Sequence, residues 1–213
     1  DVSGSMGSQA ELKGDDGDNI PHGWSVLDIA KHSICTFMST LDGDDHLAIV
    51  TYSNNAQIIL PWTRCDEAGQ RAAKQRMEGM DPDNATNLTA GLTAGFEALS
   101  TLFASTAIGA KTCNLIVTTD GLPTASYAPS AGYGALVRSL RAKLTRQHGP
   151  QASPTISAIG LGYELDSSLL SDISDVFLHM PDPGTVAPFI VHLVAATRAT
   201  ATARLGGVEC VLK

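Results

Sequence analysis

The sequence is poor in basic residues, in aromatic residues and in long apolar runs. It has 14 Lys and Arg against 22 Asp and Glu in 213 residues, a formal net charge of −8, and only 5% of the residues are aromatic. A nucleic-acid-binding surface requires a basic stripe, which this acidic balance argues against. No stretch approaches the roughly 18 consecutive apolar residues of a membrane span. These absences argue against a nucleic-acid partner and against a membrane-spanning segment in this piece.

Cysteine is also scarce, and the cysteines are widely spaced. The four of them show no CxxC pattern and no Cys/His spacing; they are Cys35, Cys65, Cys113 and Cys210. Zinc sites built on thiolates and dithiol redox motifs both need such spacing. The sequence therefore predicts neither.

What the chain does contain is enough apolar sequence for one folded unit. Hydrophobic residues make up 43% of it and charged residues 17%, which is typical of a globular protein. At roughly 100–200 residues per domain, this length predicts a single domain. We expect that domain to span residues 1–202, and residues 203–213 to begin a following segment or strand.

Helical and strand patterns alternate along the chain, which predicts an α/β domain with a mainly parallel sheet. A turn at Asn54-Asn55 predicts that the strands on either side of it pair antiparallel. The helix over 131–147 is basic, which is typical of a solvated face. Helices are predicted over 25–41, 66–80, 87–103, 131–147, 167–174 and 185–201, and strands over 46–52, 57–60, 114–119, 154–161 and 175–179.

Three separate segments carry oxygen-bearing side chains: DVSGS at 1–5, DNATNL at 83–88 and TTDG at 118–121. In an open α/β sheet these would be loops beyond the carboxyl ends of the strands, where such folds bind ligands. Two carboxylates and three hydroxyls are hard donors, suited to Mg²⁺, Mn²⁺ or Ca²⁺ and poorly suited to zinc. Neutral hydroxyls leave the cation electrophilic, so that a partner's carboxylate can complete its coordination. The pattern indicates a recognition-type metal site.

In this order, DVSGSM, ATNL and TTDG resemble the von Willebrand factor type A (vWA) domain with its metal-ion-dependent adhesion site (MIDAS), from residue 1 to about residue 200. The resemblance implies a doubly wound, mainly parallel sheet with one antiparallel edge strand and helices on both faces. It also implies five metal ligands, direct or through water: Asp1, Ser3, Ser5, Thr86 and Asp120. The segments LGYELDSSLLSDIS and HMPDPGTV further resemble vWA proteins of protists and fungi.

The sequence departs from the family pattern in two places. The apolar strand that normally precedes D-x-S-x-S is absent, so we expect the chain to be a fragment lacking the first central strand. Ala85 stands where the family often has Gly before the Thr. Nearby, Asp83 could add a carboxylate, and the loop over 11–18 is unusually acidic for the rim of a site.

These patterns favour a non-enzymatic module that binds an acidic residue of a protein partner through a held divalent cation, with Mg²⁺ expected and Mn²⁺ or Ca²⁺ as alternatives. One alternative function is a structural subunit of a larger assembly with an empty metal site. Another is a Mg²⁺-dependent hydrolase, although no general base or nucleophile can be nominated beside the metal set. Asn84 begins a glycosylation sequon whose glycan would crowd Thr86. That crowding favours a cytoplasmic setting, or a sequon left unused.

Overall fold

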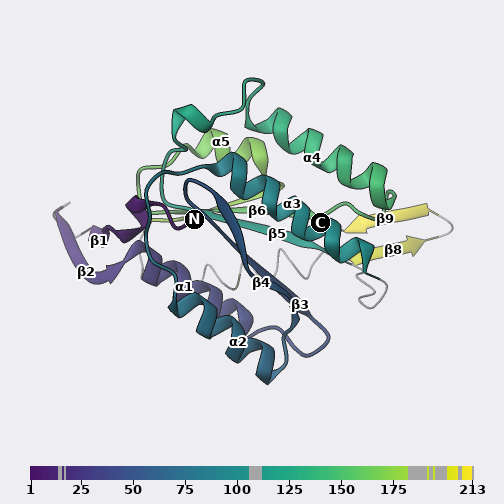
Figure 1. The fold of residues 1–213 in the computed structure, drawn as a ribbon, viewed down its shortest axis with the longest axis horizontal. Coiled ribbons are helices and arrows are strands. Elements are labelled where there is room, and N and C mark those ends of the chain that lie inside the picture. The colour runs from purple at the N-terminus through teal and green to yellow at the C-terminus, as the bar shows by residue number, and fades with distance from the viewer. Residues whose placement is uncertain are drawn as a thin grey trace.

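The computed structural model of the chain describes residues 1–13, 16, 18–105, 112–181, 191, 194, 201–205 and 208–212. Strands lie between two layers of helices (Figure 1). The strands are β1 (Gln9–Lys13), β2 (Asn19–Ser25), β3 (His46–Tyr52), β4 (Ala56–Arg64), β5 (Asn114–Thr119), β6 (Thr155–Leu161), β7 (Val176–Met180), β8 (Ala201–Leu205) and β9 (Val208–Leu212). The helices are η1 (Gly4–Gly7), α1 (Val26–Met38), α2 (Glu67–Glu78), α3 (Leu88–Ala104), η2 (Ala125–Tyr127), α4 (Tyr133–His148) and α5 (Ser167–Ile173).

Four groups of hydrogen-bonded strands are present in the described chain. Strands β5, β6 and β7 pair in parallel in that order, with Thr119 opposite Gly160 at the carboxyl end of β5. Strands β3 and β4 pair antiparallel around the turn at Asn54-Asn55. Strands β1 and β2 form one hairpin, and β8 and β9 another. This is an α/β fold with a parallel sheet and an antiparallel strand pair beside it.

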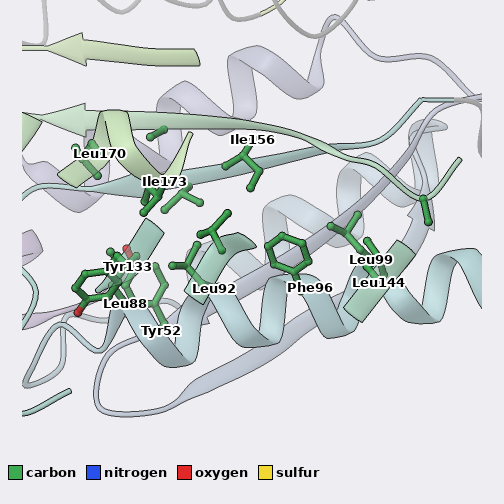
Figure 2. Close-up of a cluster of buried hydrophobic side chains, with 14 residues drawn as sticks. Tyr52, Leu88, Leu92, Phe96, Leu99, Tyr133, Leu144, Ile156, Leu170 and Ile173 are labelled. Atoms are coloured by element: carbon green, nitrogen blue, oxygen red, sulfur yellow. The ribbon is translucent and has the colours of Figure 1, made fainter. Parts of the chain in front are cut away.

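Helices cover both faces of the strands. Helices α3, α4 and α5 lie on one side and α1 and α2 on the other (Figure 1). The largest buried cluster joins α3, α4 and α5 to β5 and β6, and includes Leu92 and Phe96 of α3, Leu144 of α4 and Ile156 of β6 (Figure 2). Separate clusters lie under α1 and α2. Burial on both faces explains why the apolar run of β5 is continuous rather than alternating.

Most of the expected elements are present with bounds shifted by a few residues. The strands predicted over 46–52 and 114–119 are β3 and β5, and the predicted antiparallel pairing of β3 with β4 is confirmed. The helix predicted to begin at residue 25 is α1, which Ser25 caps in a capping box with Asp28. The β1–β2 hairpin was not predicted, and its first strand contains residues 11–13 of the segment expected to be an acidic loop. Most of the helix predicted over 185–201 lies outside the described residues.

No described helix has the length and apolarity needed to cross a membrane.

The start of α3 is held firmly against β3. The side chain of Asn87 caps the helix by accepting a hydrogen bond from the Ala90 amide at 3.0 Å, and it also donates to the carbonyl of Asn54 at 2.8 Å. One turn later, Gly91 lies directly against the ring of Tyr52. The hydroxyl of Tyr52 donates to the carbonyl of Thr118 on β5 at 3.2 Å. These contacts tie the ends of β3 and β5 to the first turn of α3.

The close approach at Gly91 predicts that Gly91→Ala destabilises the protein. An alanine Cβ there would lie 2.7 Å from two ring atoms of Tyr52, which has no free space to move into. Overpacking of this kind costs about 1–3 kcal/mol, which exceeds the gain in helix propensity of at most about 1 kcal/mol. Urea unfolding should show a lower free energy for Gly91→Ala. The control is Gly79→Ala, whose Cβ would meet nothing closer than 3.7 Å; equal stability of the two variants would contradict the packing argument.

Candidate metal site

The three segments singled out in the sequence meet at one end of the strands. The Val2 amide donates to the Tyr52 carbonyl at the end of β3, and the Asp1 nitrogen donates to the Thr118 carbonyl near the end of β5. The loop before α3 joins them, because the Gly4 amide donates to the Asn84 carbonyl at 2.9 Å. These segments therefore lie beyond the carboxyl ends of the strands, as we expected from the sequence.

The carboxyl group of Asp1 is oriented by two donors. Its Oδ1 accepts the Ser3 backbone amide at 2.8 Å, and its Oδ2 accepts the hydroxyl of Thr119 at 2.6 Å. Thr119 is 2% exposed and Ser3 is 1% exposed. Hydrogen bonds to an ionised acceptor are the stronger kind, so this carboxylate has a defined orientation.

A second set of hydrogen bonds connects the first loop to Asp120. The hydroxyls of Ser3 and Ser5 lie 3.1 Å apart, and Ser5 donates to Asp120 Oδ1 at 2.8 Å. Because a hydroxyl has only one proton, Ser5 must accept from Ser3 when it donates to Asp120. The structure thus brings Asp1, Ser3, Ser5 and Asp120 into one group, and the exposed side chain of Ser5 places that group at the surface.

Thr86 is placed beside this group by backbone contacts. Its amide donates to the Thr124 hydroxyl at 3.1 Å, and its carbonyl accepts the Thr124 amide at 3.0 Å. Its side chain is buried, with 7% exposed, and among the described residues its hydroxyl makes no hydrogen bond. No hydrogen bond joins the Thr86 side chain to the other four predicted ligands.

The carboxyl groups of Asp1 and Asp120 form no ion pair with a Lys, Arg or His side chain of the described chain. Burial raises the pKa of Asp120 above its ordinary value, partly offset by the hydrogen bond from Ser5. The ion pairs of the described chain lie elsewhere, between Arg71 and Glu67 and between Arg141 and Asp175. Two carboxylates and three hydroxyls with no Lys or Arg partner among the described residues form a donor set that fits a hard divalent cation.

The hydroxyls are essential to this fit. Among the described residues, no group of three or more His, Cys, Asp or Glu side chains is placed to hold a metal ion. Asp83, which the sequence suggested as a further carboxylate, is instead contacted by Ser53 and by the neighbouring Asn84 amide.

Two positioning residues were missed in the sequence. Thr119 orients Asp1, and Thr124 holds the backbone of Thr86. Thr119 directly precedes Asp120 in TTDG, and this position next to a predicted ligand is the one feature of the sequence that could have indicated its role. Nothing in the sequence marks Thr124, because its role depends on how the loop after β5 folds back toward α3.

Comparison with known proteins agrees with this geometry. The family model of the von Willebrand factor type A domain matches residues 1–148, more than half of the chain. The chain belongs to this family. The predicted vWA membership and the α/β fold class are both confirmed.

Solved structures show the same fold at low identity. A von Willebrand factor type A protein from Catenulispora acidiphila has a TM-score of 0.69 and 18% identity, over 95% of this chain and 42% of that one. Proximal thread matrix protein 1 from the mussel byssus, with a zinc-occupied MIDAS motif, has a TM-score of 0.59 and 19% identity, over 79% and 42%. The pilus adhesin SpaC from Lactobacillus rhamnosus GG has a TM-score of 0.63 and 12% identity, over 94% and 30%.

The vWA chain thus spans less than half the length of each of these proteins. No match is found among curated proteins. The closer likeness to protist and fungal members that we expected from the sequence is not supported by the comparisons.

The Thr119–Asp1 hydrogen bond predicts an effect of Thr119→Val, which keeps the shape of the side chain and removes its hydroxyl. A buried hydrogen bond to a charged group contributes about 1.5–3 kcal/mol. We expect the free energy of unfolding in EDTA to fall by that amount in urea titrations. Thr118→Val is the matched control, because the Thr118 hydroxyl makes no hydrogen bond in the described chain. If both variants lost the same free energy of unfolding, the hydrogen bond from Thr119 to Asp1 would make no specific contribution to stability.

The raised pKa of Asp120 predicts a pH dependence of the metal-free protein. The folded state holds this proton more tightly than the unfolded chain, so ionised Asp120 opposes folding above its raised pKa, and the opposition fades as the pH falls through it. Asp120→Asn should therefore be more stable than wild type in EDTA at neutral and alkaline pH, with a difference that narrows as the pH falls through the raised pKa of Asp120. The exposed Asp81→Asn removes the same formal charge; a pH trend shared by both variants would mean that the effect is only one of net charge.

Proposed function

We propose that this vWA domain is a metal-dependent protein-interaction module. Asp1, Ser3, Ser5, Thr86 and Asp120 hold a divalent cation, and an Asp or Glu of a partner completes its coordination. The observation that carries the proposal is the hydrogen-bonded path from Ser3 through Ser5 to Asp120, at a surface position. This path brings together oxygen donors from residues 3–5 and from residue 120, two segments that the family pattern also combines.

Each residue has a distinct part in holding the ion. The Ser5 proton is directed at Asp120, which leaves oxygen lone pairs of the hydroxyls free for a cation. Thr119 and the Ser3 amide restrict the rotation of the Asp1 carboxylate. The bound cation would supply positive charge that attracts an external carboxylate. Outer hydrogen bonds of this kind orient ligands and raise metal affinity.

Hard oxygen donors favour Mg²⁺, Mn²⁺ or Ca²⁺. The zinc-occupied MIDAS motif of the byssal protein shows that such a motif also accepts zinc in at least one relative, so zinc belongs among the ions tested. Family members are mostly adhesion or interaction modules, which supports a binding role over hydrolysis. We keep residues 1–202 as the proposed extent of the domain.

The proposal predicts that divalent cations stabilise the protein and that EDTA reverses the effect. An ion that binds only the native state contributes about 2.7 kcal/mol at a free concentration about 100 times its Kd. Thermal unfolding with Mg²⁺, Mn²⁺, Ca²⁺ and Zn²⁺ in turn should show an upward shift for wild type, and none for Ser5→Ala or Asp120→Ala. Ser8→Ala is the matched control, an exposed serine just beyond the site that should keep the full shift.

Partner binding is tested by selecting displayed random peptides in the stabilising ion and eluting with EDTA. Recovered peptides should be enriched in Asp and Glu, and Asp120→Ala should give no enrichment. Failure of every ion to stabilise the protein would favour the structural-subunit alternative. Ion binding without acidic peptides would contradict recognition through a carboxylate, and turnover of a phosphoester that Ser3→Ala abolishes would favour the hydrolase.

A further inference from the structure

Helix α4 is strongly basic in a strongly acidic chain. Its residues Tyr133–His148 include Arg138, Arg141, Lys143 and Arg146 and no Asp or Glu. The whole chain has a net charge of −8, so the rest of the molecule has a net charge of −12. The positive charge is therefore concentrated on one helix.

Only one of these four cations takes part in an ion pair within the described chain. Arg141 pairs with Asp175 and also donates to the carbonyl of Pro154. The side chains of Arg138, Lys143 and Arg146 are exposed and form no ion pair with any described residue. We call these three residues the α4 basic surface.

A groove lies between α3 and α4, and Lys143 of the α4 basic surface lines it. It has a volume of about 320 Å³. Its apolar floor includes Phe96, Leu140 and Leu144, and Lys143 and Gln147 of α4 face Glu97 of α3 across it. Phe96 and Leu144 belong to the main core, and Figure 2 labels both among its buried side chains. Volumes of this size are in the range that holds bound side chains or small ligands.

The two walls of the groove are fixed to each other at its far end. Ser100 of α3 and His148 of α4 form a hydrogen bond of 2.8 Å, and the rings of Phe103 and His148 are 6.1 Å apart. The groove begins near Thr93 and reaches Ala104, whereas the metal site lies at the opposite, amino-terminal end of α3. At about 1.5 Å per residue, Thr86 and the nearest groove residue of α3, Thr93, are roughly 10 Å apart, and none of the five predicted ligands lines the groove, so the groove and the metal site are distinct surfaces.

We propose that the α4 basic surface and the α3–α4 groove together bind an acidic protein segment that inserts an apolar side chain into the groove. The unpaired Lys143 at an apolar groove, with the exposed Arg146 three residues further along the same helix, complements a segment that carries both carboxylates and an aliphatic residue. Three cations are fewer than the four to eight basic residues typical of an anionic-membrane site, and the acidic remainder of the chain repels a long polyanion such as RNA. A short acidic segment touches only the local positive charge, because salt screens beyond about 8 Å.

This surface gives the domain two binding faces, one at the amino-terminal end of α3 and one along the side of α3 that faces α4. One partner would be held through the metal, and a second through charge and apolar contact that need no metal. The inference does not depend on the proposed metal site, so the two are separable by EDTA.

The test is fluorescence anisotropy in EDTA with labelled peptides of about 12 residues. One peptide has Glu residues around two central Leu, a second replaces Leu with Ser, and a third replaces Glu with Lys. Wild type should bind the Glu/Leu peptide best, and the triple variant R138Q/K143Q/R146Q should bind it about tenfold more weakly or worse. The matched control R71Q/K74Q/R76Q removes three cations from α2 and should stay within about twofold of wild type.

The groove is tested separately by Ala104→Phe, which adds bulk at its rim and leaves the charges in place. This variant should bind the Glu/Leu peptide only as well as wild type binds the Glu/Ser peptide. Urea midpoints of all variants establish that they are folded. Absence of binding to the acidic peptides, equal loss in the α2 control, or tighter binding to phosphatidylserine vesicles or to an RNA oligonucleotide than to the Glu/Leu peptide would overturn the proposal.

Discussion

The hydrogen bond from Ser5 to Asp120 is the contact on which the rest of the site depends. It joins the first loop of the chain to the end of β5, over a separation of 115 residues. The hydrogen bonds of Asp1 with Thr118 and Thr119 also hold the first loop against the end of β5, and the Ser5 bond adds the carboxylate of Asp120 to that group. The bond also decides which way the Ser5 proton points, and so which atoms are free to contact a cation. A local hydrogen bond therefore sets both the geometry and the chemistry of the site.

The same contact involves a carboxyl group whose burial disfavours its charged form. Burial raises the pKa of Asp120, which means that its ionised form is held at a cost in free energy, and the hydrogen bond from Ser5 offsets only part of that cost. A protein that needed only a stable turn would place a neutral residue there, or pair the carboxylate with Lys or Arg. The carboxylates here have no cationic side chain as a partner and are oriented by neutral hydroxyls. A bound cation would therefore stabilise them more than it would stabilise carboxylates already paired with Lys or Arg.

Regular elements were largely predictable from the sequence because their signals are local. The spacing of apolar residues in α1, the Ser25 cap at its start and the β-branched run of β5 are each signals contained within a few residues of sequence. The β1–β2 hairpin was missed because Pro21 and Gly23 interrupt any alternation in β2. Within the site, the motif located Asp1, Ser3, Ser5 and Asp120, which the structure joins. The role of Thr124 could not be predicted, since it depends on the approach of two loops that are 38 residues apart.

Helix α3 connects the two ends of the molecule that matter for binding. Its first turn is fixed by Asn87 and by the contact of Gly91 with Tyr52, and its last turns form one wall of the groove beside α4. Its buried face runs along the main core, so neither end can move far without disturbing the packing of Leu92, Phe96 and Leu99. A rigid element of this kind holds two surfaces at a constant separation without making them cooperative. A domain built this way is suited to connecting two partners, one bound through a cation and the other through its acidic and apolar side chains.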